Sequence, residues 1–446
     1  MKNRHLSAKA RAPGPLQSKT PMTTLEHRGL APVRSVLDNG VRIIAKHSGA
    51  TPAVTIHASF EAGTVFDPPH ESGVAHFVSR TIDRGTTSHT ADEIAERLDY
   101  RGVSLALTVN RHVLSLLCTC LVEDLDAILG TLADIVTHPT FPEREVDTRR
   151  GEIVTMIRQD EDNPAAMAAE GLLSLLYGPM HPYGRRPRGT VETVERIARS
   201  SLQAFHAARF TPGSLSLVMV GDLDAKRGIE SAARAFAEWR PAAAARPLFP
   251  AIEPARERRV RVIPMMNKAQ ADIAYGFTTI TRADPAFYAY WLMNNILGEY
   301  SIGGRLGDSI RERQGMAYYV FSALDANVIP GPLLIRAGVN PANVDRALAS
   351  IDEEITRMAA EGPTDRELAE SRQFLIGSLP RRLETNIGIA NFLQMVEFFG
   401  LGMDYDVSVP ELLTRVTRDE VHAAARAVLD PSRAAVVVAG PYTGPG

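Results

Sequence analysis

The stretch Gly73-Val74-Ala75-His76-Phe77-Val78-Ser79-Arg80, followed closely by Arg84-Gly85-Thr86, decides how this sequence is interpreted. It predicts a helix. Residues four apart on a helix lie on one face, so His76 and Arg80 share a face and Ser79 lies beside them. This arrangement is unfavourable for a metal ion, because Arg80 would hold a fixed positive charge where the cation would sit.

A helix with this frame carries the zinc site of peptidases that use the motif H-x-x-E-H. There both histidines bind zinc and the glutamate activates the attacking water. His76 is in the first position of the motif, but Ser79 replaces the general base and Arg80 replaces the second ligand. A catalytic zinc normally takes three protein ligands and a water. We therefore interpret His76 as a helix histidine that is hydrogen-bonded in a half-buried face.

Length and composition are those of a globular protein. The 446 residues fit about two or three domains, and hydrophobic and charged contents of 45% and 23% are ordinary. The net charge of −3 gives no basic footprint, so nucleic acid is not an expected partner. The sequence contains no apolar run long enough to span a membrane, so no membrane span is predicted. Cys118 and Cys120 cannot form a disulfide framework and are expected to be two small buried residues.

The N-terminal segment bears on localisation. Residues 1–24 hold five Lys or Arg residues, and no acidic residue occurs before Glu26. This charge pattern resembles a transit peptide. Pro13 and Pro15 interrupt any long amphipathic helix, however, so we interpret residues 1–32 as a disordered tail that is not cleaved. The expected compartment is the bacterial cytoplasm, with the mitochondrion as the alternative.

Two similar halves are indicated on either side of a proline-rich linker, residues 240–259. Three anchors of a helix–proline–strand series repeat at a constant offset of 219 residues, namely Leu202 with Val421, Pro212 with Pro431, and Gly221 with Gly440. Anchors in register predict an internal duplication. Each half mixes helices and strands without regular βαβ alternation, which favours the α+β class. We expect one domain over residues 33–239 and a second over residues 260–441.

Several landmarks together resemble the pitrilysin/insulinase family of inverted-motif zinc peptidases, in its short, processing-peptidase-like branch. They are Asn39-Gly40, Glu61-Ala62-Gly63-Thr64, Gly73 to Thr86, Glu161-Asp162-Asn163-Pro164, His181-Pro182-Tyr183-Gly184, Gly189-Thr190, Pro212 to Asp222, Arg305-Leu306 and Ile310 to Val320. The resemblance implies two homologous domains of the mitochondrial-processing-peptidase/LuxS-like metallohydrolase fold, each a mainly antiparallel sheet packed with helices. It also implies a second chain that completes a chamber.

Within this resemblance, each further catalytic position that can be matched holds a residue of a different type. Met156 stands where active relatives place the third zinc ligand, a glutamate, and Arg149 stands where they place a supporting glutamate. Leu105 stands where they place the asparagine of a substrate-binding strand. Glu152, a turn before Met156, is expected to face solvent or to pair with Arg149. The resemblance therefore implies no catalytic zinc in this chain.

The second half keeps two residues that the family uses on the substrate. A helix is predicted over Gly304–Arg313 and a strand over Met316–Phe321, so the turn between them can bring Arg311 and Tyr318 together. Their spacing, R-x6-Y, resembles the family's Arg/Tyr pair, which holds the substrate backbone and helps to stabilise the oxyanion. Without the resemblance they would be an arginine at a helix C-terminus and a tyrosine on a half-buried strand. Tyr319 is expected on the other sheet face.

The preceding Leu297–Gly304 segment is moderately glycine-rich. It resembles the glycine-rich loop of the non-catalytic mitochondrial processing peptidase subunit, although it is shorter and has fewer glycines. A flexible connection between helices is an equally good interpretation. A phosphate-binding loop is excluded, because no Gly-Lys-Ser/Thr follows.

The favoured hypothesis is a non-catalytic subunit of a heterodimeric zinc peptidase, inactive alone. A homologous partner chain would supply the intact H-x-x-E-H motif, the Zn²⁺ and the general base. This chain would supply Arg311 and Tyr318, which act on a peptide substrate from across the chamber.

Two alternatives come from other classes of protein. The first is a purely structural core-type subunit of a larger respiratory or processing complex. Such a subunit needs the fold but neither the zinc ligands nor the Arg311/Tyr318 pair. The second is an independent hydrolase that uses Ser79 as a nucleophile. The sequence disfavours it, because no G-x-S-x-G elbow surrounds Ser79 and the residue lies in the middle of a helix.

Overall fold

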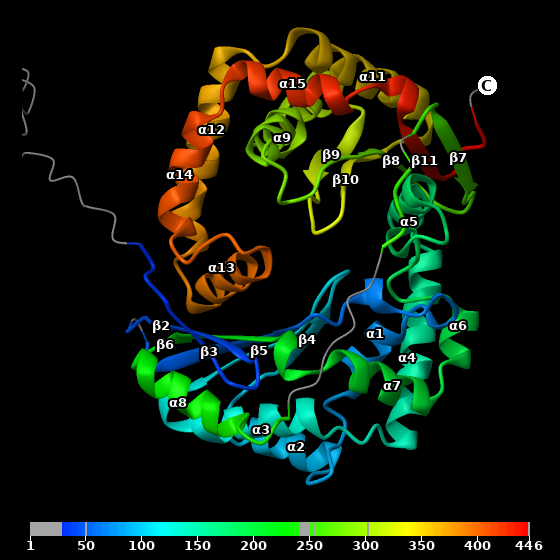
Figure 1. The fold of residues 1–446 in the computed structure, drawn as a ribbon. Helices are drawn as coiled ribbons and strands as arrows, with labels where there is room; N and C mark the ends of the chain where they lie inside the picture. The colour runs from blue at the N-terminus through cyan, green and yellow to red at the C-terminus, as the bar shows by residue number, and fades with distance from the viewer. Residues whose placement is uncertain (1–28, 50, 241–248, 254, 301–302, 445–446) are drawn as a thin grey trace, which may run out of the picture.

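The computed structural model describes residues 29–49, 51–240, 249–253, 255–300 and 303–444, which form two halves with one β-sheet each (Figure 1). Residues 1–28 of the predicted tail and residues 241–248 of the predicted linker lie outside the described residues. Val33 begins the first strand. Arg259, at the end of the predicted linker, already belongs to a strand of the second sheet.

The first half contains a six-stranded sheet packed with helices. Its strands are β1 (Val33–Val36), β2 (Arg42–His47), β3 (Ala53–Phe60), β4 (Ala106–Val109), β5 (Leu114–Leu121) and β6 (Leu215–Gly221). Its helices are α1 (Val74–Thr81), α2 (Ala91–Asp99), α3 (Leu125–Thr137), α4 (Glu143–Glu161), α5 (Pro164–Tyr177), α6 (Val191–Arg196), α7 (Arg199–Arg209) and α8 (Ala225–Ala235). The strand order is β1-β2-β6-β3-β5-β4, with only β2 and β6 parallel among these described strands.

The second half contains a five-stranded sheet of order β7-β11-β8-β10-β9. Its strands are β7 (Arg259–Pro264), β8 (Ala271–Thr278), β9 (Ala317–Leu324), β10 (Pro332–Val339) and β11 (Ala435–Gly440). Its helices are α9 (Phe287–Asn294), η6 (Asn295–Glu299), α10 (Gly304–Leu306), η7 (Gly307–Arg313), α11 (Val344–Glu361), α12 (Asp365–Arg382), α13 (Asn386–Phe399), α14 (Tyr405–Arg415) and α15 (Arg418–Val428). Strands β7 and β11 are parallel, and the other neighbours are antiparallel.

The two sheets share one arrangement, which confirms the internal duplication and the α+β class. Strands β2, β6, β3, β5 and β4 have β7, β11, β8, β10 and β9 as their counterparts. The anchor glycines Gly221 and Gly440 end equivalent strands with φ angles of +156° and +137°. A Cβ atom at either position would overlap the backbone of Ala53 or Ala271. Glycine is therefore required twice, at the same place in the repeated unit.

Each sheet buries one face against the helices of its own half. In the first half, alternate residues of β3 and β5, such as Ile56 and Leu116, are completely buried in this core. Cys118 and Cys120 belong to the same core and are free thiols, as predicted. Burial raises the pKa of each thiol to about 12, so neither is a reactive thiolate at neutral pH.

The opposite face of each sheet is covered by a helix from the other half. Helix α5 of the first half packs on β8 and β11 of the second sheet, where Leu172 meets Val437 in a small apolar cluster. Helix α13 of the second half packs on β3 and β6 of the first sheet, where Leu393 meets Val218. The halves therefore exchange helices, and neither sheet is complete without the other half.

Gln394 of α13 connects this helix to the first sheet through its buried side chain. Its Nε2 donates to the carbonyl oxygen of His57 at 2.6 Å and to that of Ser216 at 2.9 Å. Both carbonyls lie on strands that α13 covers, and His57, Ser216 and Gln394 are all buried. One side chain thus satisfies two buried acceptors across the boundary between the halves.

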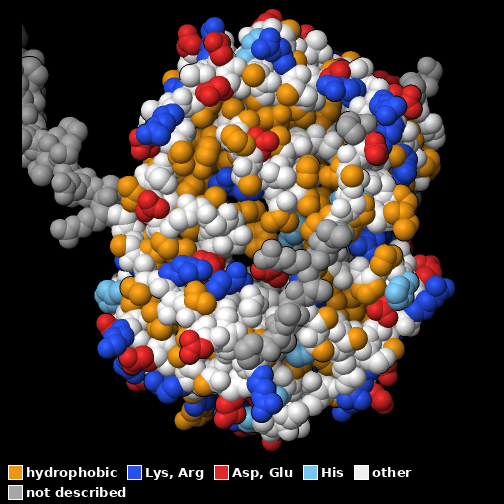
Figure 2. All heavy atoms as spheres, in the orientation of Figure 1, with side chains coloured by type: hydrophobic (Ala, Val, Ile, Leu, Met, Phe, Trp, Pro, Cys, Tyr) orange, Lys and Arg blue, Asp and Glu red, His pale blue; other side chains and the backbone are white. Residues whose placement is uncertain are grey.

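The face of the molecule drawn in Figure 2 is hollowed between the two halves, and hydrophobic side chains gather on the wall formed by the second half. Strand β9 forms one edge of the second sheet and β4 one edge of the first. Among the described residues, no helix is both long enough and apolar enough to cross a membrane.

We expect Gln394→Ala to lower the free energy of unfolding by about 2–3 kcal/mol, because two buried carbonyl groups each lose a donor across the boundary between the halves. Urea denaturation measures the change. Gln203→Ala on the exposed surface of α7 is the matched control, with an expected effect below about 0.5 kcal/mol. Equal effects of the two substitutions would contradict the assigned role.

Candidate functional site

Helix α1 is fixed at its N-terminus by a buried carboxylate. Gly73 precedes the helix with a φ of +101°, and the backbone N–H groups of Gly73 and Ala75 donate to Asp67 at 2.7 and 3.0 Å. Burial raises the pKa of Asp67 to about 7, although these two hydrogen bonds oppose the rise. The frame that the sequence predicted for His76 is therefore present and rigidly held.

Ser79 and Arg80 stand at the positions of the missing base and ligand, and each is held by a structural contact. Ser79 is buried, and its hydroxyl donates to the carbonyl oxygen of His76 at 2.6 Å. This geometry is that of a helix serine bonded to its own backbone, and it offers no activated nucleophile. Arg80 reaches across to α4, where its Nη2 lies 3.3 Å from Oε2 of Glu152.

Helix α4 presents arginine and methionine where a zinc site would need carboxylates. Met156 is half-buried against the core of the first half. Arg149 forms an ion pair with Glu152, as the sequence predicted, and a second one with Glu145 at 3.5 Å. Arg80, Glu152, Arg149 and Glu145 therefore form a ladder of alternating charge that joins α1 to α4 without a metal ion.

His76 lies beside this ladder with its ring largely buried. Its Nε2 atom is buried and has no hydrogen-bond partner among the described residues, so the predicted hydrogen bond is absent at that atom. Burial lowers the pKa of His76 to about 4, and the nearby cations Arg188 and Arg80 lower it further. The imidazole is therefore neutral at physiological pH.

The side chains at these positions do not fit zinc. Of the four predicted positions, only His76 carries a group that binds Zn²⁺ readily, whereas a catalytic site needs about three such groups. The described residues include no group of three or more His, Cys, Asp or Glu side chains that could hold a metal ion. Leu105, at the position of the substrate asparagine, is a half-buried apolar residue just before β4.

Arg311 and Tyr318 lie on consecutive elements of the second half. Arg311 is on η7, a π-helix within the helical stretch that the sequence predicted, and its Nε donates to Oε1 of the adjacent Glu312 at 2.9 Å. Tyr318 is 68% exposed near the start of β9. Within the described part of the chain no hydrogen bond joins the two side chains, so the predicted contact between them is not formed.

A β-bulge sets the position of Tyr318. In the pairing of β9 with β10, Tyr319 faces Gly338 and Ala317 faces Val339, which leaves Tyr318 without a partner residue. Bulges of this kind redirect a side chain and are common beside active sites. Tyr319 turns to the sheet face that α5 covers, where its hydroxyl donates to Asp272. Gly338 leaves the space for its ring, since a Cβ there would contact Tyr319 at 2.5 Å.

The glycines before η7 allow close packing against β9. A Cβ on Gly298 would lie 2.5 Å from the backbone nitrogen of Ser322, and one on Gly303 would lie 2.6 Å from the carbonyl oxygen of Val320. Gly303 and Gly304 also have positive φ angles, +104° and +57°. This part of the predicted glycine-rich segment therefore packs helices against an edge strand. Residues 301–302 lie outside the described residues.

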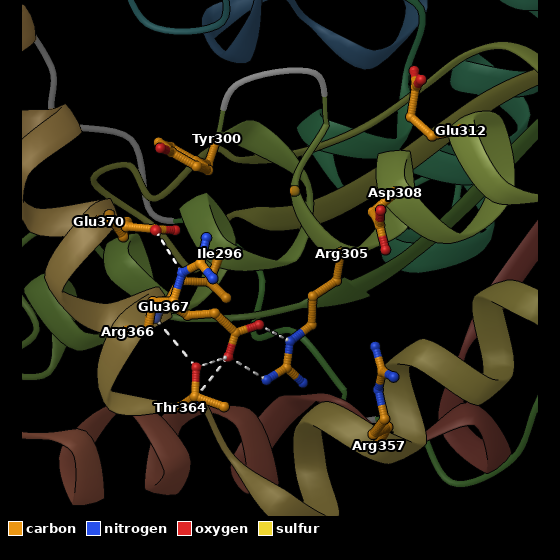
Figure 3. A pocket seen from close by; sticks show the side chains of 12 residues that line it. Ile296, Tyr300, Arg305, Asp308, Glu312, Arg357, Thr364, Arg366, Glu367 and Glu370 are labelled. Carbon is orange, nitrogen blue, oxygen red and sulfur yellow. Dashed lines mark hydrogen bonds and ion pairs between the residues drawn. The ribbon is translucent and has the colours of Figure 1, made fainter.

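An ion pair anchors the helical stretch that carries Arg311. Arg305 donates through Nε and Nη2 to the two carboxylate oxygens of Glu367 on α12, at 2.6 and 2.7 Å (Figure 3). Glu367 also accepts from the backbone and hydroxyl of Thr364. Hydrogen bonds from Arg305 and Thr364 outweigh the effect of burial and hold the pKa of Glu367 at about 2. The pair lines a cavity of about 570 Å³, together with Glu312 and Tyr300.

Two family models match the chain. One is described as "Insulinase (Peptidase family M16)" and matches residues 42–184, and the other is described as "Peptidase M16 inactive domain" and matches residues 196–375. The chain belongs to the insulinase (M16) peptidase family. This confirms the resemblance that the landmarks indicated.

Relatives and solved structures of similar length agree with this membership. An "uncharacterized zinc protease" of Streptomyces coelicolor is 26% identical and covers 99% of this chain and 97% of its own. The crystal structure of a peptidase M16 inactive domain from Pseudomonas fluorescens has a TM-score of 0.84 at 24% identity, covering 94% and 99% of the two chains. A protease from Helicobacter pylori has a TM-score of 0.86 at 15% identity, covering 93% and 100%. The last two show the fold.

The sequence offered the Arg149–Glu152 pair as one of two outcomes but did not predict the long-range contacts of the other residues. Arg80 and Glu152 are 72 residues apart, and nothing in the spacing predicts their pairing. The buried cap Asp67 lies in a loop without a distinctive motif. Arg305 was a landmark of the resemblance, yet its ion pair with Glu367 depends on how α12 is placed.

We expect Glu367→Gln to destabilise the protein by about 2 kcal/mol at neutral pH, since it breaks a paired, partly buried charge that solvent screens only in part. The pKa of Glu367 is about 2 when folded, against an ordinary value of 4.5. The stabilisation is therefore complete above about pH 4.5 and is lost as the pH falls towards 2. Urea titrations across this range should show a steeper loss of stability for the parent chain than for Glu367→Gln. Glu370→Gln, a half-exposed neighbour whose ion pair with Arg366 lies at the surface, should follow the parent.

We expect His76→Leu to reduce the acid sensitivity of the chain. The folded pKa of His76 is about 4, below its ordinary value of 6.5, so its contribution to stability is complete above pH 6.5 and declines as the pH falls towards 4. Thermal unfolding midpoints between these pH values should decrease less in His76→Leu than in the parent. The exposed His70→Leu should follow the parent, and a parallel response of all three proteins would contradict the assignment.

Proposed function

We propose that this M16 chain is the non-catalytic, substrate-binding subunit of a heterodimeric zinc metallopeptidase. Arg311 and Tyr318 would hold the peptide backbone and stabilise the oxyanion. A homologous partner chain would supply the intact H-x-x-E-H motif, the zinc ion and the general base. Family membership supports the fold and the peptidase relation, and the two side-chain sets of this chain support its division of labour with a partner.

The observation that carries the proposal is the state of Tyr318. It is a large aromatic side chain that is 68% exposed, and the bulge leaves it unpaired in the ladder. A structural role would require contacts that it does not make, since none of the described residues forms a hydrogen bond or ring contact with it. Among the described residues, the Arg311 side chain likewise pairs only with its sequence neighbour Glu312. Such a surface ion pair contributes about 0–1 kcal/mol, so it is easily exchanged for a substrate contact.

The chemistry of the two groups suits an acyl-transfer reaction. A guanidinium and a phenol are hydrogen-bond donors near neutral pH, and they can both point at one carbonyl oxygen. Negative charge grows on that oxygen in the tetrahedral intermediate, so donors held in place stabilise the transition state more than the ground state. The anchored stretch from Arg305 to η7 would keep Arg311 in position for this task.

The alternating ladder at the former zinc position supports the same division. It places Arg80 and Arg149 among carboxylates that already pair with them, so no ligand set is free for a cation. The helix frame is kept because it packs in the core. A purely structural subunit would also keep that frame, but it gives no reason for an exposed Tyr318 seven residues after Arg311.

Reconstitution with a zinc-bearing M16 partner tests the proposal. Arg311→Ala and Tyr318→Phe should each lower kcat by about 10²–10³-fold, the usual cost of one oxyanion donor. Arg313→Ala is the matched control, because this exposed arginine lies two residues away and pairs with Asp308. Peptide hydrolysis by the mixed chains is the measurement.

Metal content gives an independent result. The active heterodimer should contain one zinc per pair of chains, bound by the partner. Two zinc ions per pair, or full activity after Arg311→Ala, would overturn the proposed role. If the pair of chains contains one zinc and stays fully active after Arg311→Ala or Tyr318→Phe, the structural-subunit alternative is favoured.

A further inference from the structure

Arg282, in the loop between β8 and α9, is a buried arginine that pairs with no carboxylate in the described part of the chain. Its side chain and backbone together are only 8% exposed. No Asp or Glu among the described residues lies within ion-pair distance of it, whereas many other arginines of the chain have such a partner. A buried charge is costly unless something compensates it.

Aromatic rings hold the guanidinium in one orientation. Its central carbon lies 3.7 Å from the ring centre of Phe287 and between 5.6 and 5.8 Å from those of Tyr288, Tyr405 and Phe399. Nη2 donates to the hydroxyl of Tyr405 at 2.8 Å. Stacking against rings fixes the plane of a guanidinium and leaves its N–H edge available, which is how arginine is prepared to bind a planar anion.

The remaining N–H groups of Arg282 have no acceptor within the described residues, yet they are not sealed from solvent. Arg209, the other buried arginine of the described chain, differs in this respect. It stacks on Phe66 at 3.6 Å and donates to the carbonyl oxygen of Glu61 at 3.0 and 2.7 Å. An internal acceptor thus faces the edge of Arg209, whereas the edge of Arg282 is left for an acceptor from outside.

The position of Arg282 suits a ligand that enters between the halves. Its backbone N–H donates to the carbonyl oxygen of Asn327 in the β9–β10 turn at 2.7 Å. Phe399 ends α13, the helix that lies on the first sheet, and Tyr405 begins α14. Figure 1 places α9, α13 and β9 around the space between the two halves, which Figure 2 shows as a hollow.

We propose that Arg282 is a carboxylate-binding site for the peptide that this subunit holds. The ligand is a planar carboxylate, either the C-terminal group of the peptide or an acidic side chain within it. A guanidinium binds such a group through two parallel, charge-assisted hydrogen bonds. The inference rests on the proposed function, because it assigns a specificity to the same peptide-binding subunit.

The site can be tested on the whole chain without a partner. N-acetylglycine carries the carboxylate, and N-acetylglycinamide is the same molecule without the charge. In the chain labelled with ¹⁵N-arginine, the Nε–H signal that disappears in Arg282→Lys belongs to Arg282. N-acetylglycine should shift that signal saturably, and the amide should not. No shift, or equal shifts from both compounds, would overturn the proposal.

Peptides then distinguish the two sources of the carboxylate. One fluorescent peptide is compared as free acid and C-terminal amide, and with an internal Glu or Gln. Loss of the relevant carboxylate should weaken binding about tenfold, the effect of one charge-assisted contact. The difference should vanish in Arg282→Lys, which keeps the charge but loses the fork, and persist in Arg415→Gln, an exposed arginine of α14. A difference that persists undiminished in Arg282→Lys would overturn the proposal.

The two proposals fail in different ways. If Arg311→Ala has no effect on the reconstituted peptidase but N-acetylglycine still shifts the Arg282 signal, the carboxylate site stands and the oxyanion role is lost. If Arg311→Ala inactivates the pair and no compound shifts the signal, the carboxylate site is wrong and the proposed function stands.

Discussion

The exchange of helices between the halves is the constraint on which the rest of this structure depends. A sheet that buries one face against its own helices still exposes an apolar surface on the other. Here α5 and α13 cover those surfaces, each on the sheet of the opposite half. Because each half needs the other, the helix α1 of the first half and the strand β9 of the second keep a fixed relation across the hollow.

That fixed relation connects the altered zinc position with the residues that the second half keeps. On one side, the zinc position is replaced by salt bridges from α1 to α4, with Arg80 and Glu152 at their centre. On the other side, a bulge presents Tyr318 to solvent. A chain that had lost all function would be free to lose both features together. The contrast between the incomplete zinc ligand set and the exposed Tyr318 is the basis of the division of labour that we propose.

Three arginines of the second half differ in the groups that surround their guanidinium charge. Arg305 is paired with Glu367 through two hydrogen bonds and serves packing. Arg311 pairs with Glu312 alone among the described residues, at a surface where one ion pair is easily exchanged for another. Arg282 is stacked in a cage of rings and has no carboxylate among the described residues. These differences depend on burial and on the available acceptor, and they separate a structural arginine from two candidates for binding.

Much of the fold followed from local patterns in the sequence. The equal offset of the anchors predicted two similar sheets, since a repeated unit must place Gly221 and Gly440 at the same close backbone contact. The R-x6-Y spacing predicted that Arg311 and Tyr318 lie on successive elements. The predicted helix around Arg311 is present, and only the structure shows that it is a π-helix there, because hydrophobic periodicity over so few residues does not distinguish an α-helix from a π-helix.

The sequence by itself determined that the ligand set for zinc is incomplete, because the identities of Ser79, Arg80 and Met156 settle which donor atoms exist. It also determined that the chain is a duplication. Only the tertiary structure decided what took the place of the ligands, which tyrosine is presented, and which helix covers which sheet. Those outcomes depend on pairs such as Arg80 with Glu152 and His57 with Gln394, which are 72 and 337 residues apart. Local spacing carries no information about such contacts, since they form only when separate elements pack.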